Sequence, residues 1–591
     1  MLVYGDAVRR ETAKEKLDRI RHYLDEAARG QPWIVGHGWL VAAVVEAGEL
    51  AQGIADRAFK ARGRYDERSI ELEQAMELVL ALARQVGRSW SGYECHSDGA
   101  LSALARLDEI ASGEALTIKL PEGFAHYALY PESYFEAASP LAGRTMDVVG
   151  VRSIGTTLAA MVAAAIGTPC PETVRPTGHP FDRQLAFAGG ERLGLRPNAE
   201  LAIVDEGPGL SGSSIVAVAK AAAAQGVTPD HIHVFPSHGN GPGPKASVEA
   251  QHFWNTARTH VRSFDDLAFG SDDRRHVASW VTDLIGEPTG AIRDISGGVW
   301  RGLRPGDPAD WPPVHPWQER RKFLVETASG TWLLKFAGLG RTGLEKFALA
   351  QALGAAGFSP PPLAFRHGFI VERWQDNATS LDPFGPGRAR FLARLGQYLG
   401  FRARSVPVGP DRGASAGQLF EMLRVNAEEE FGPNGAHGLD AWRPCLPGLD
   451  ADARRVATDN RLHAWEWLVL PGGDILKTDA VDHHVAHDLV GSQDIAWDVA
   501  GASAEFALSA DEQLDVIELI ERESGVGVSR QHVRFMTLSY PAFQLGYYRE
   551  AIGSTADRSE AARLRTSAER YAAILLRNLE NDSELDAPEA G

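Results

Sequence analysis

The sequence predicts a multidomain α/β protein with a helical N-terminal section, a parallel-sheet α/β domain and a C-terminal α+β domain. Residues 11–90 carry apolar side chains at helical spacing. From about residue 115, short apolar runs alternate with helices, which is typical of a parallel sheet with helical crossovers. From residue 295, a hairpin and a helix precede a mostly helical remainder. These three changes in pattern predict the fold class.

Length and composition indicate a large folded chain. The 591 residues suggest about three to four domains. A hydrophobic fraction of 44% and a charged fraction of 23% predict sizeable buried cores. The formal net charge of -18 argues against nucleic-acid or acidic-membrane partners, because both need a basic surface. We therefore expect a small-molecule partner, and leave homo-oligomerisation open.

The three cysteines, Cys95, Cys170 and Cys445, lie far apart in the sequence. They form no metal-binding or disulfide pattern, which fits a reducing compartment. The charged start of the chain lacks a signal-peptide core. The apolar run 157–166 is too short to cross a bilayer. We expect a cytoplasmic protein.

The helical section, residues 1–114, begins with EKLDRIRHYLDEAARG (15–30). Further on, Glu46, Glu49 and Asp56 recur at near-helical spacing. We interpret these acids as a solvated face of a helix, and the alternative is that they line a pocket.

The α/β domain, residues 115–290, contains one stretch that favours a sugar phosphate. The apolar strand 201–204 ends at Asp205 and Glu206, at the edge where parallel sheets bind ligands. Two carboxylates suit the diol of a ribose or a hydrated Mg²⁺ ion. The glycine- and serine-rich loop that follows suits a 5-phosphate, through backbone N–H groups and hydroxyls. The candidate ribose-phosphate residues are Asp205, Glu206, Gly209, Ser211, Gly212, Ser213 and Ser214.

VDEGPGLSGSS resembles the phosphoribosyl-pyrophosphate-binding motif of type I phosphoribosyltransferases, with Glu as the second acid and one extra residue before Ser-Gly. Upstream, MDVVGVRSIGTT resembles the diphosphate loop of that family, and 175–184 occupies the place of its mobile flap. The resemblance implies transfer of ribose 5-phosphate from phosphoribosyl pyrophosphate, with Mg²⁺ at Asp205 and Glu206. The implied diphosphate-binding residues are Arg152, Ser153, Gly155, Thr156, Thr157, Arg175 and Arg183.

The third region, residues 295–582, begins with RKFLVETASGTWLLKFAG, a predicted hairpin with its turn at 328–330. Lys335 ends the second strand and Glu345 lies near the start of the next helix. A strand lysine paired with a helix glutamate is how kinases hold the α- and β-phosphates of ATP. The only candidate for a glycine-rich nucleotide loop is ISGGVWRGL (295–303). The acidic end, 583–591, is expected to be a flexible tail.

The segment VGSQDIAWDVAG (490–501) resembles the catalytic region of aminoglycoside-phosphotransferase-like kinases. This resemblance implies an Mg²⁺ site at Glu466 and Asp479, and a catalytic Asp459 that orients the acceptor hydroxyl. The family's HGDxxxxN string is absent, because Glu466 stands in place of the asparagine and Asp459 lies seven residues before it, not five.

Between these motifs, DHHVAHD (482–488) places His483 and His487 at i,i+4 spacing. This spacing permits a transition-metal site, but we favour a location for His483, His484 and His487 near the kinase metal site or in structural hydrogen bonds.

Together these patterns predict a bifunctional enzyme. One domain transfers ribose 5-phosphate to an unknown acceptor, and the other uses ATP and Mg²⁺ to phosphorylate the product or its precursor. One alternative is a nucleotide-sensing regulator with two non-catalytic domains. Another is cleavage of a nucleotide glycosidic bond in place of its synthesis.

Overall fold

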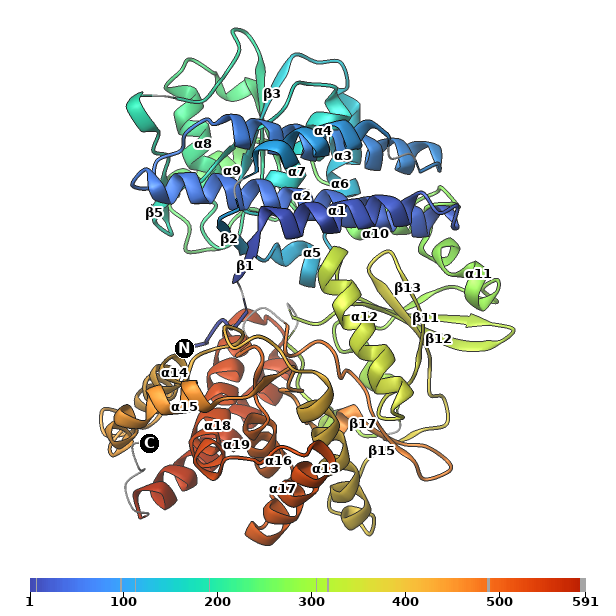
Figure 1. Ribbon diagram of the computed structural model, residues 1–591, viewed down its shortest axis with the longest axis vertical. Helices are drawn as coiled ribbons and strands as arrows, with labels where there is room; N and C mark the ends of the chain where they lie inside the picture. The colour runs from blue at the N-terminus through green and yellow to red at the C-terminus, as the bar shows by residue number, and fades with distance from the viewer. Residues whose placement is uncertain are drawn as a thin grey trace.

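The computed structural model describes residues 1–6, 8–95, 98–111, 113–190, 192–304, 306–315, 318–485 and 489–584. The helical section and the parallel sheet lie together at the top of Figure 1, above the antiparallel sheet with α12 and the C-terminal helices. Almost all of the predicted tail, 583–591, lies outside the described residues.

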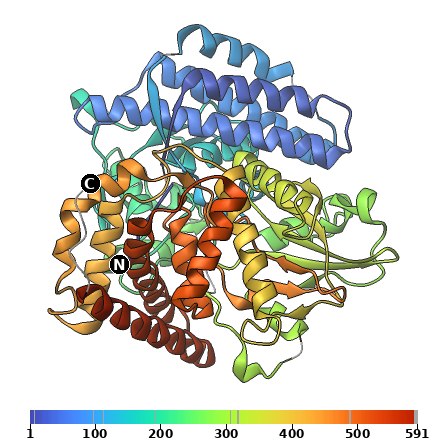
Figure 2. The ribbon, with the colours of Figure 1, turned by 60° about the horizontal axis from the view of Figure 1, so that its bottom comes forward.

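The N-terminal section consists of a short strand and four helices. The helix α1 begins at a capping box, in which Glu15 N–H donates to the Thr12 hydroxyl and Thr12 N–H donates to the Glu15 carboxylate. In Figure 2 these helices form a blue layer along one side of the molecule. The elements are β1 (Val8–Thr12), α1 (Ala13–Ala27), α2 (Trp33–Ala61), α3 (Ile70–Gly92) and α4 (Asp98–Ile110).

The acidic positions of α2 are not a solvated face, contrary to our interpretation of the sequence. Glu46 and Glu49 are buried and accept hydrogen bonds from Lys16 of α1, at 3.0 and 2.6 Å. Asp56 accepts a hydrogen bond from Arg152 of the α/β domain at 3.1 Å. By length and composition α2 could cross a membrane, but most of its apolar stretch is buried in the fold, as in a core helix.

The parallel sheet has the strand order β4-β3-β7-β8-β9. Its strands are short and largely buried, because helices pack on both faces. The first of the apolar runs predicted to form this sheet, LTIKL (116–120), does not join it, because β2 pairs antiparallel with β1. The elements are β2 (Ala115–Lys119), α5 (Glu122–His126), α6 (Pro131–Ala138), β3 (Met146–Val151), α7 (Gly155–Ile166), β4 (Glu172–Val174), β5 (Thr177–His179), β6 (Asp182–Gln184), β7 (Glu200–Val204), α8 (Ser213–Ala223), β8 (Ile232–Phe235), α9 (Val248–Thr256), β9 (Arg258–Thr259), α10 (Phe264–Ala268) and α11 (Thr282–Ile285).

The predicted hairpin is confirmed, because β11 and β12 pair antiparallel and Thr327 lies opposite Gly330. It is the centre of a five-stranded antiparallel sheet of order β10-β11-β12-β14-β13. The helix α12 follows β12 and connects it to β13. The elements are β10 (Arg293–Asp294), β11 (Lys322–Thr327), β12 (Gly330–Phe336), α12 (Gly340–Ala355), β13 (Pro362–Arg366) and β14 (Phe369–Arg373).

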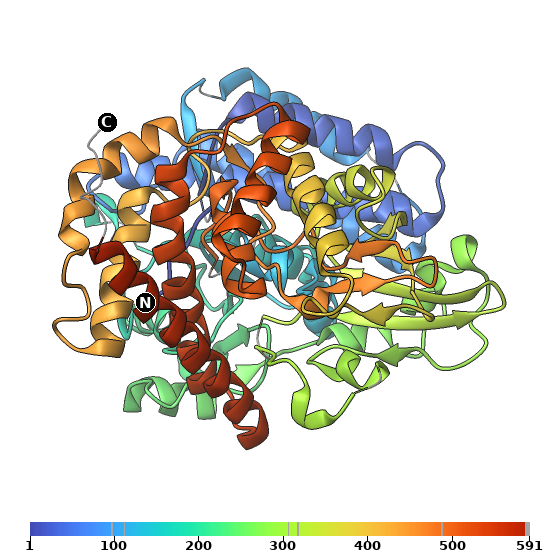
Figure 3. The same cartoon turned by 90° about the horizontal axis from the view of Figure 1, so that it is seen from below.

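The remainder is mostly helical, with a small hairpin, β17–β18, beside the five-stranded sheet (Figure 3). The first residues of the chain also belong to this part, because the Met1 ammonium donates to Asn426 at 2.6 Å. The elements are β15 (Thr379–Ser380), α13 (Arg388–Ser405), α14 (Ala416–Phe431), α15 (Leu446–Asp452), β16 (Arg455–Val456), β17 (Trp467–Val469), β18 (Ile475–Lys477), β19 (Gln493–Asp494), α16 (Ala496–Phe506), α17 (Ala510–Ser524), α18 (Arg530–Ser554) and α19 (Arg558–Ser583).

One buried cluster joins three parts of the protein. Glu132 of α6 lies 2.8 Å from His37 of α2 and 2.9 Å from His367 of the β13–β14 turn, all measured to the same carboxylate oxygen. All three side chains are fully buried. The helical section, the parallel-sheet domain and the antiparallel sheet therefore share one continuous core.

A second buried carboxylate, Glu505, joins the C-terminal helices. It accepts hydrogen bonds from Tyr540 at 2.9 Å, from Tyr571 at 2.6 Å and from Arg570 at 3.1 Å. Burial opposes ionisation, but His463 and these donors together lower the pKa of Glu505 to about 2. The ionised carboxylate therefore ties α16 to α18 and α19.

We expect Glu505→Gln to lower the free energy of unfolding by about 3 kcal/mol at pH 7, because it breaks a buried charged network. The folded-state pKa of Glu505 lies below the ordinary value of 4.5. Its stabilisation is therefore complete above pH 4.5 and is lost as the pH falls toward 2. Urea unfolding of both proteins at pH 7, 5 and 3.5 measures this difference.

The exposed variant Glu569→Gln on α19 is the control, and should change stability little at any of these pH values. A deficit of Glu505→Gln that stayed constant down to pH 3.5 would contradict the role of the ionised carboxylate.

Candidate functional site

A cavity of about 200 Å³ lies between the five-stranded sheet and the C-terminal helical part. Its wall on the sheet side is largely apolar and aromatic, with Leu333, Ile370 and Trp374 among its lining residues. Ile295 and Trp300, from the candidate nucleotide loop, also line the cavity. A flat heterocycle such as a nucleotide base would fit such a surface.

Charged residues gather at the other end of the cavity. Lys335, at the end of β12, contacts both Asp479 and Asp482, and Lys346 of α12 lies 2.8 Å from Asp482. Burial alone would lower the pKa of Lys335, but the two carboxylates raise it above its ordinary value. Lys335 therefore stays charged next to two acids, as a phosphate-binding lysine must.

Glu345 does not pair with Lys335, which corrects our prediction of an ATP-binding pair. Its carboxylate is 43% exposed and accepts from Arg341 at 2.6 Å, on the same helix. A second partner, Arg9, lies 3.7 Å away on β1. The acids that contact Lys335 are Asp479 and Asp482, in the segment after β18. The residue after Glu345 on α12 is Lys346, which pairs with Asp482.

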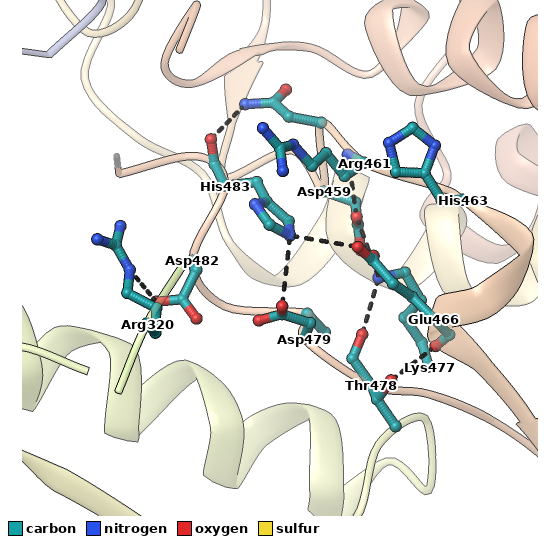
Figure 4. A network of polar contacts seen from close by, with 12 residues as sticks. Arg320, Asp459, Arg461, His463, Glu466, Lys477, Thr478, Asp479, Asp482 and His483 are labelled. Carbon is teal, nitrogen blue, oxygen red and sulfur yellow. Dashed lines mark hydrogen bonds and ion pairs between the residues drawn. The ribbon is translucent and has the colours of Figure 1, made fainter. Parts of the chain in front are cut away.

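The charged end also contains a cluster of three candidate metal ligands, Glu466, Asp479 and His483 (Figure 4). The His483 Nε2 lies 3.8 Å from Glu466 and 4.0 Å from Asp479. Within the described residues this nitrogen has no hydrogen-bond partner, although it is buried. Burial and nearby cations keep the pKa of His483 well below its ordinary value, so the ring is neutral. Two carboxylate oxygens and a neutral imidazole fit a divalent cation.

Local structure explains why these groups meet. Asp479 follows the strand β18 with a φ of 56°, a conformation that is uncommon for residues other than glycine and asparagine or aspartate. The Lys477 ammonium donates to Glu466 at 2.6 Å. Burial raises the pKa of Glu466 to about 8, although Lys477 opposes this shift. The hairpin β17–β18 thus holds both acids on one side of the cavity.

Asp459 does not face the cavity, which corrects its predicted role as the catalytic acid. Its fully buried carboxylate accepts a short hydrogen bond from Tyr398 and pairs with Arg402 at 3.5 Å and Lys477 at 3.4 Å. The backbone N–H of Asp459 donates to Asp498 at 2.7 Å. The acid therefore stabilises the loop, and cannot reach an acceptor hydroxyl.

Arg461 lines the cavity instead, and sequence reasoning missed it. It stands five residues before Glu466, the spacing at which the kinase-like motif carries its catalytic acid. That spacing was the signal available in the sequence. Tyr547 and Tyr548 of α18, which also line the cavity, gave no signal because their helix lies far along the chain.

Of the predicted histidine group, His483 lies at the site, and His484 is buried without lining the cavity. His487 lies outside the described residues, so both its predicted location near the kinase metal site and the alternative metal site with His483 stay untested.

A separate set of loops converges at the carboxyl edge of the parallel sheet. The loop after β7 carries Asp205, whose pKa burial raises to about 7. In the next turn, Gly212 has a φ of 62° and a Cβ there would lie 2.3 Å from Trp254, so only glycine fits. The Ser213 hydroxyl donates to the Pro180 carbonyl at 2.7 Å, which joins the loop to the β5–β6 hairpin. Three of the other predicted residues, Glu206, Gly209 and Ser211, lie in the same loop, and Ser214 lies in the first turn of α8.

The predicted diphosphate loop reaches this edge, but its arginines are already paired. Arg152 is buried against Asp56 and Asp66 of the helical section, and Arg175 donates to Asp56 at 2.7 Å. Arg183 donates to Gly178 within its own hairpin at 3.1 Å. Acids of the N-terminal section therefore neutralise the two inner arginines, which corrects their expected availability for a diphosphate.

The other residues of this loop lie close to α2. Ser153 accepts from Arg175 at 3.3 Å, and Gly155 approaches the end of β7. The Thr157 hydroxyl packs against Gly48 of α2. Among the described residues, the buried Thr156 hydroxyl has no hydrogen-bond partner.

No protein-family model matches the chain, and neither does any curated protein. The chain is similar to the crystal structure of choline kinase LicA from Streptococcus pneumoniae, at 14% identity over 50% of this chain and 98% of that one, with a TM-score of 0.31. A choline/ethanolamine kinase family protein from Mesorhizobium loti matches at 17% identity over 49% and 93%, with a TM-score of 0.29. A thermostable mutant of aminoglycoside phosphotransferase APH(4)-Ia matches at 13% identity over 51% and 98%, again at 0.29.

Proposed function

We propose that the part of the chain from β10 onward is an ATP-dependent phosphotransferase acting on a small molecule. The observation that carries this proposal is the meeting of Lys335, Asp479 and Glu466 at one end of a cavity whose other end carries apolar and aromatic side chains. A nucleotide base would occupy the apolar end, and Lys335 would hold the phosphates.

Glu466 and Asp479, with His483 beside them, would hold the divalent cation, which when bound neutralises charge on the phosphoryl group. Lys322 lies 4.0 Å from Asp479 and adds positive charge on the same side. The protein groups mainly position the reactants and stabilise charge, which is what phosphoryl transfer requires.

The test combines binding and turnover. We expect the non-hydrolysable ATP analogue AMP-PNP with Mg²⁺ to raise the melting temperature of the full chain. Incubation with ATP, Mg²⁺ and an extract of cell metabolites should release ADP and produce a new phosphorylated compound, detectable by mass spectrometry. The proposal is wrong if the nucleotide neither stabilises the protein nor is consumed.

A regulatory nucleotide sensor is the second candidate, and the burial of Asp459 against Arg402 and Tyr398 favours it. Without that acid, the described residues of the cavity do not include the group predicted to orient an acceptor hydroxyl. Stabilisation by AMP-PNP together with no ADP release from any metabolite fraction would support the sensor over the enzyme.

We also propose that the loop after β7 binds a ribose phosphate. The support is the position of Asp205 and Glu206 beside a glycine- and serine-rich turn at the carboxyl edge of the parallel sheet. The comparisons give phosphoribosyl transfer no support. The pairing of Arg152 and Arg175 with Asp56 argues against a diphosphate in the adjacent loop, and hence against phosphoribosyl pyrophosphate bound there without rearrangement.

For this second site, Asp205→Asn with Glu206→Gln should weaken the binding of ribose 5-phosphate at least about tenfold, because two hydrogen-bond acceptors for the diol are lost. AMP-PNP binding should be unchanged. Calorimetric titration of both ligands into each protein measures this, with the exposed variant Glu249→Gln as the control. Equal loss of both ligands in a folded double variant would contradict two independent sites.

A further inference from the structure

We propose that the acceptor of the C-terminal cavity carries an anionic group, a carboxylate or a phosphate monoester, and that Arg461 binds it. This inference rests on the proposed phosphotransferase function and names the substrate class of that same site. It goes beyond that function because nothing in the nucleotide-binding end of the cavity sets the charge of the acceptor.

The pairing of the cations in the cavity sets Arg461 apart. Lys335 faces Asp479 and Asp482, Lys322 faces Glu319, and Lys477 faces Glu466. Arg461, in contrast, has no carboxylate within 4.0 Å among the residues that the structure describes, and its buried Nε has no hydrogen-bond partner there. A guanidinium that lines a cavity with no carboxylate in reach is a site for an anion.

Three other arginines of the cavity wall do not compete for this role. Arg320 lies 3.9 Å from Asp482 and is therefore paired with an acid. Arg304 lies over Trp374 and Arg373 lies over Trp332, both on the side of the five-stranded sheet. Arg461 belongs to the opposite wall, which also carries Glu466 and Asp479.

Arg461 is also held in place near the charged end. Its backbone N–H donates to Asp459 at 3.2 Å, and Asp498 fixes the two preceding residues. In Figure 4 the Arg461 side chain extends past the ring of His483. An anion on Arg461 would thus lie beside the candidate cation site of Glu466, Asp479 and His483.

The contact between Arg461 and Tyr547 disfavours a cationic acceptor. Tyr547 offers a ring face of the kind that binds quaternary ammonium groups. The Arg461 guanidinium already covers that ring, with Cζ 4.4 Å from the ring centroid. A cationic acceptor would lose this ring face and meet a fixed positive charge as well. The substrate class is therefore different from the choline and aminoglycosides that the similar structures are named for.

The experiment uses the full chain with AMP-PNP and Mg²⁺, and four probes of similar size: glycerol 3-phosphate, glycerate, glycerol and choline. Calorimetry should show saturable binding of the phosphate probe, the carboxylate probe or both, and none of glycerol or choline up to about 10 mM, ~10⁴ times a micromolar protein concentration. Which anion binds more tightly distinguishes the two chemistries. Arg461→Gln should weaken anion binding at least about tenfold, and Arg461→Lys should restore part of it.

Two controls separate this inference from its premises. The exposed variant Glu249→Gln should bind the anions as the unaltered protein does, because Glu249 lies on α9 of the other domain and pairs with Lys220 there. AMP-PNP should stabilise Arg461→Gln normally. Anion binding that survives in Arg461→Gln, no anion binding at all, or tighter binding of choline overturns the inference. If AMP-PNP binds no variant while anions still bind Arg461, the phosphotransferase proposal fails and the anion site stands.

Discussion

Asp479→Asn is expected to lower the rate of phosphoryl transfer by about 10²–10³-fold with little change in stability. Asp479 is a candidate ligand of the divalent cation and a partner of Lys335, so it acts on both the metal and the phosphates. The amide keeps the shape of the side chain but removes its charge. ADP release at saturating ATP, with the acceptor fraction identified by mass spectrometry, measures the loss.

The matched control is Asp474→Asn, in the turn between β17 and β18 of the same hairpin. Asp474 is 79% exposed and its only ion-pair partner in the described chain is Arg390, 3.8 Å away. This variant should keep the full rate. Equal losses in the two variants, or a normal rate in a folded Asp479→Asn protein, would place the chemistry elsewhere.

The sequence was a good guide where short-range patterns decide the structure. Alternating and apolar runs predicted the β11–β12 hairpin, and the strand before Asp205 was predicted from four consecutive apolar residues. In both cases the local chain geometry determines where the residues lie. Asp479 and Glu466, 13 residues before it, were assigned to a metal site through the resemblance to aminoglycoside-phosphotransferase-like kinases, and the structure brings the two side chains together.

Partner choice among charged residues could not be predicted in the same way. Arg152 has the spacing of an anion-binding residue, but its partners Asp56 and Asp66 come from a helix and a loop about 90 residues earlier. Asp459 likewise meets Tyr398 and Arg402 of α13. Such pairs are set by tertiary packing and by the cost of leaving a buried charge unpaired, which a motif does not encode.

Lys335→Met is expected to reduce phosphoryl transfer and AMP-PNP affinity, each by about 10²-fold or more. Lys335 is the cation that both Asp479 and Asp482 share, so methionine removes the phosphate-binding charge and leaves two buried acids in mutual repulsion. Lys346 still pairs with Asp482, which should keep the protein folded at a lower melting temperature. Calorimetric titration with AMP-PNP, together with ADP release, separates lost binding from lost turnover.

Glu345→Gln tests the same point from the opposite side. If Lys335 required a glutamate on α12, as kinase-like sequences suggest, this variant would lose as much as Lys335→Met. The exposed carboxylate of Glu345 contacts Arg341 and Arg9, and neither arginine is among the lining residues of the cavity. We therefore expect an unchanged nucleotide affinity and rate. A large loss in Glu345→Gln would mean that α12 shifts when the nucleotide binds and that Lys335 then exchanges Asp479 for Glu345. Normal behaviour would mean that the acids after β18 alone position this lysine, and that Asp479 serves the lysine and the cation together.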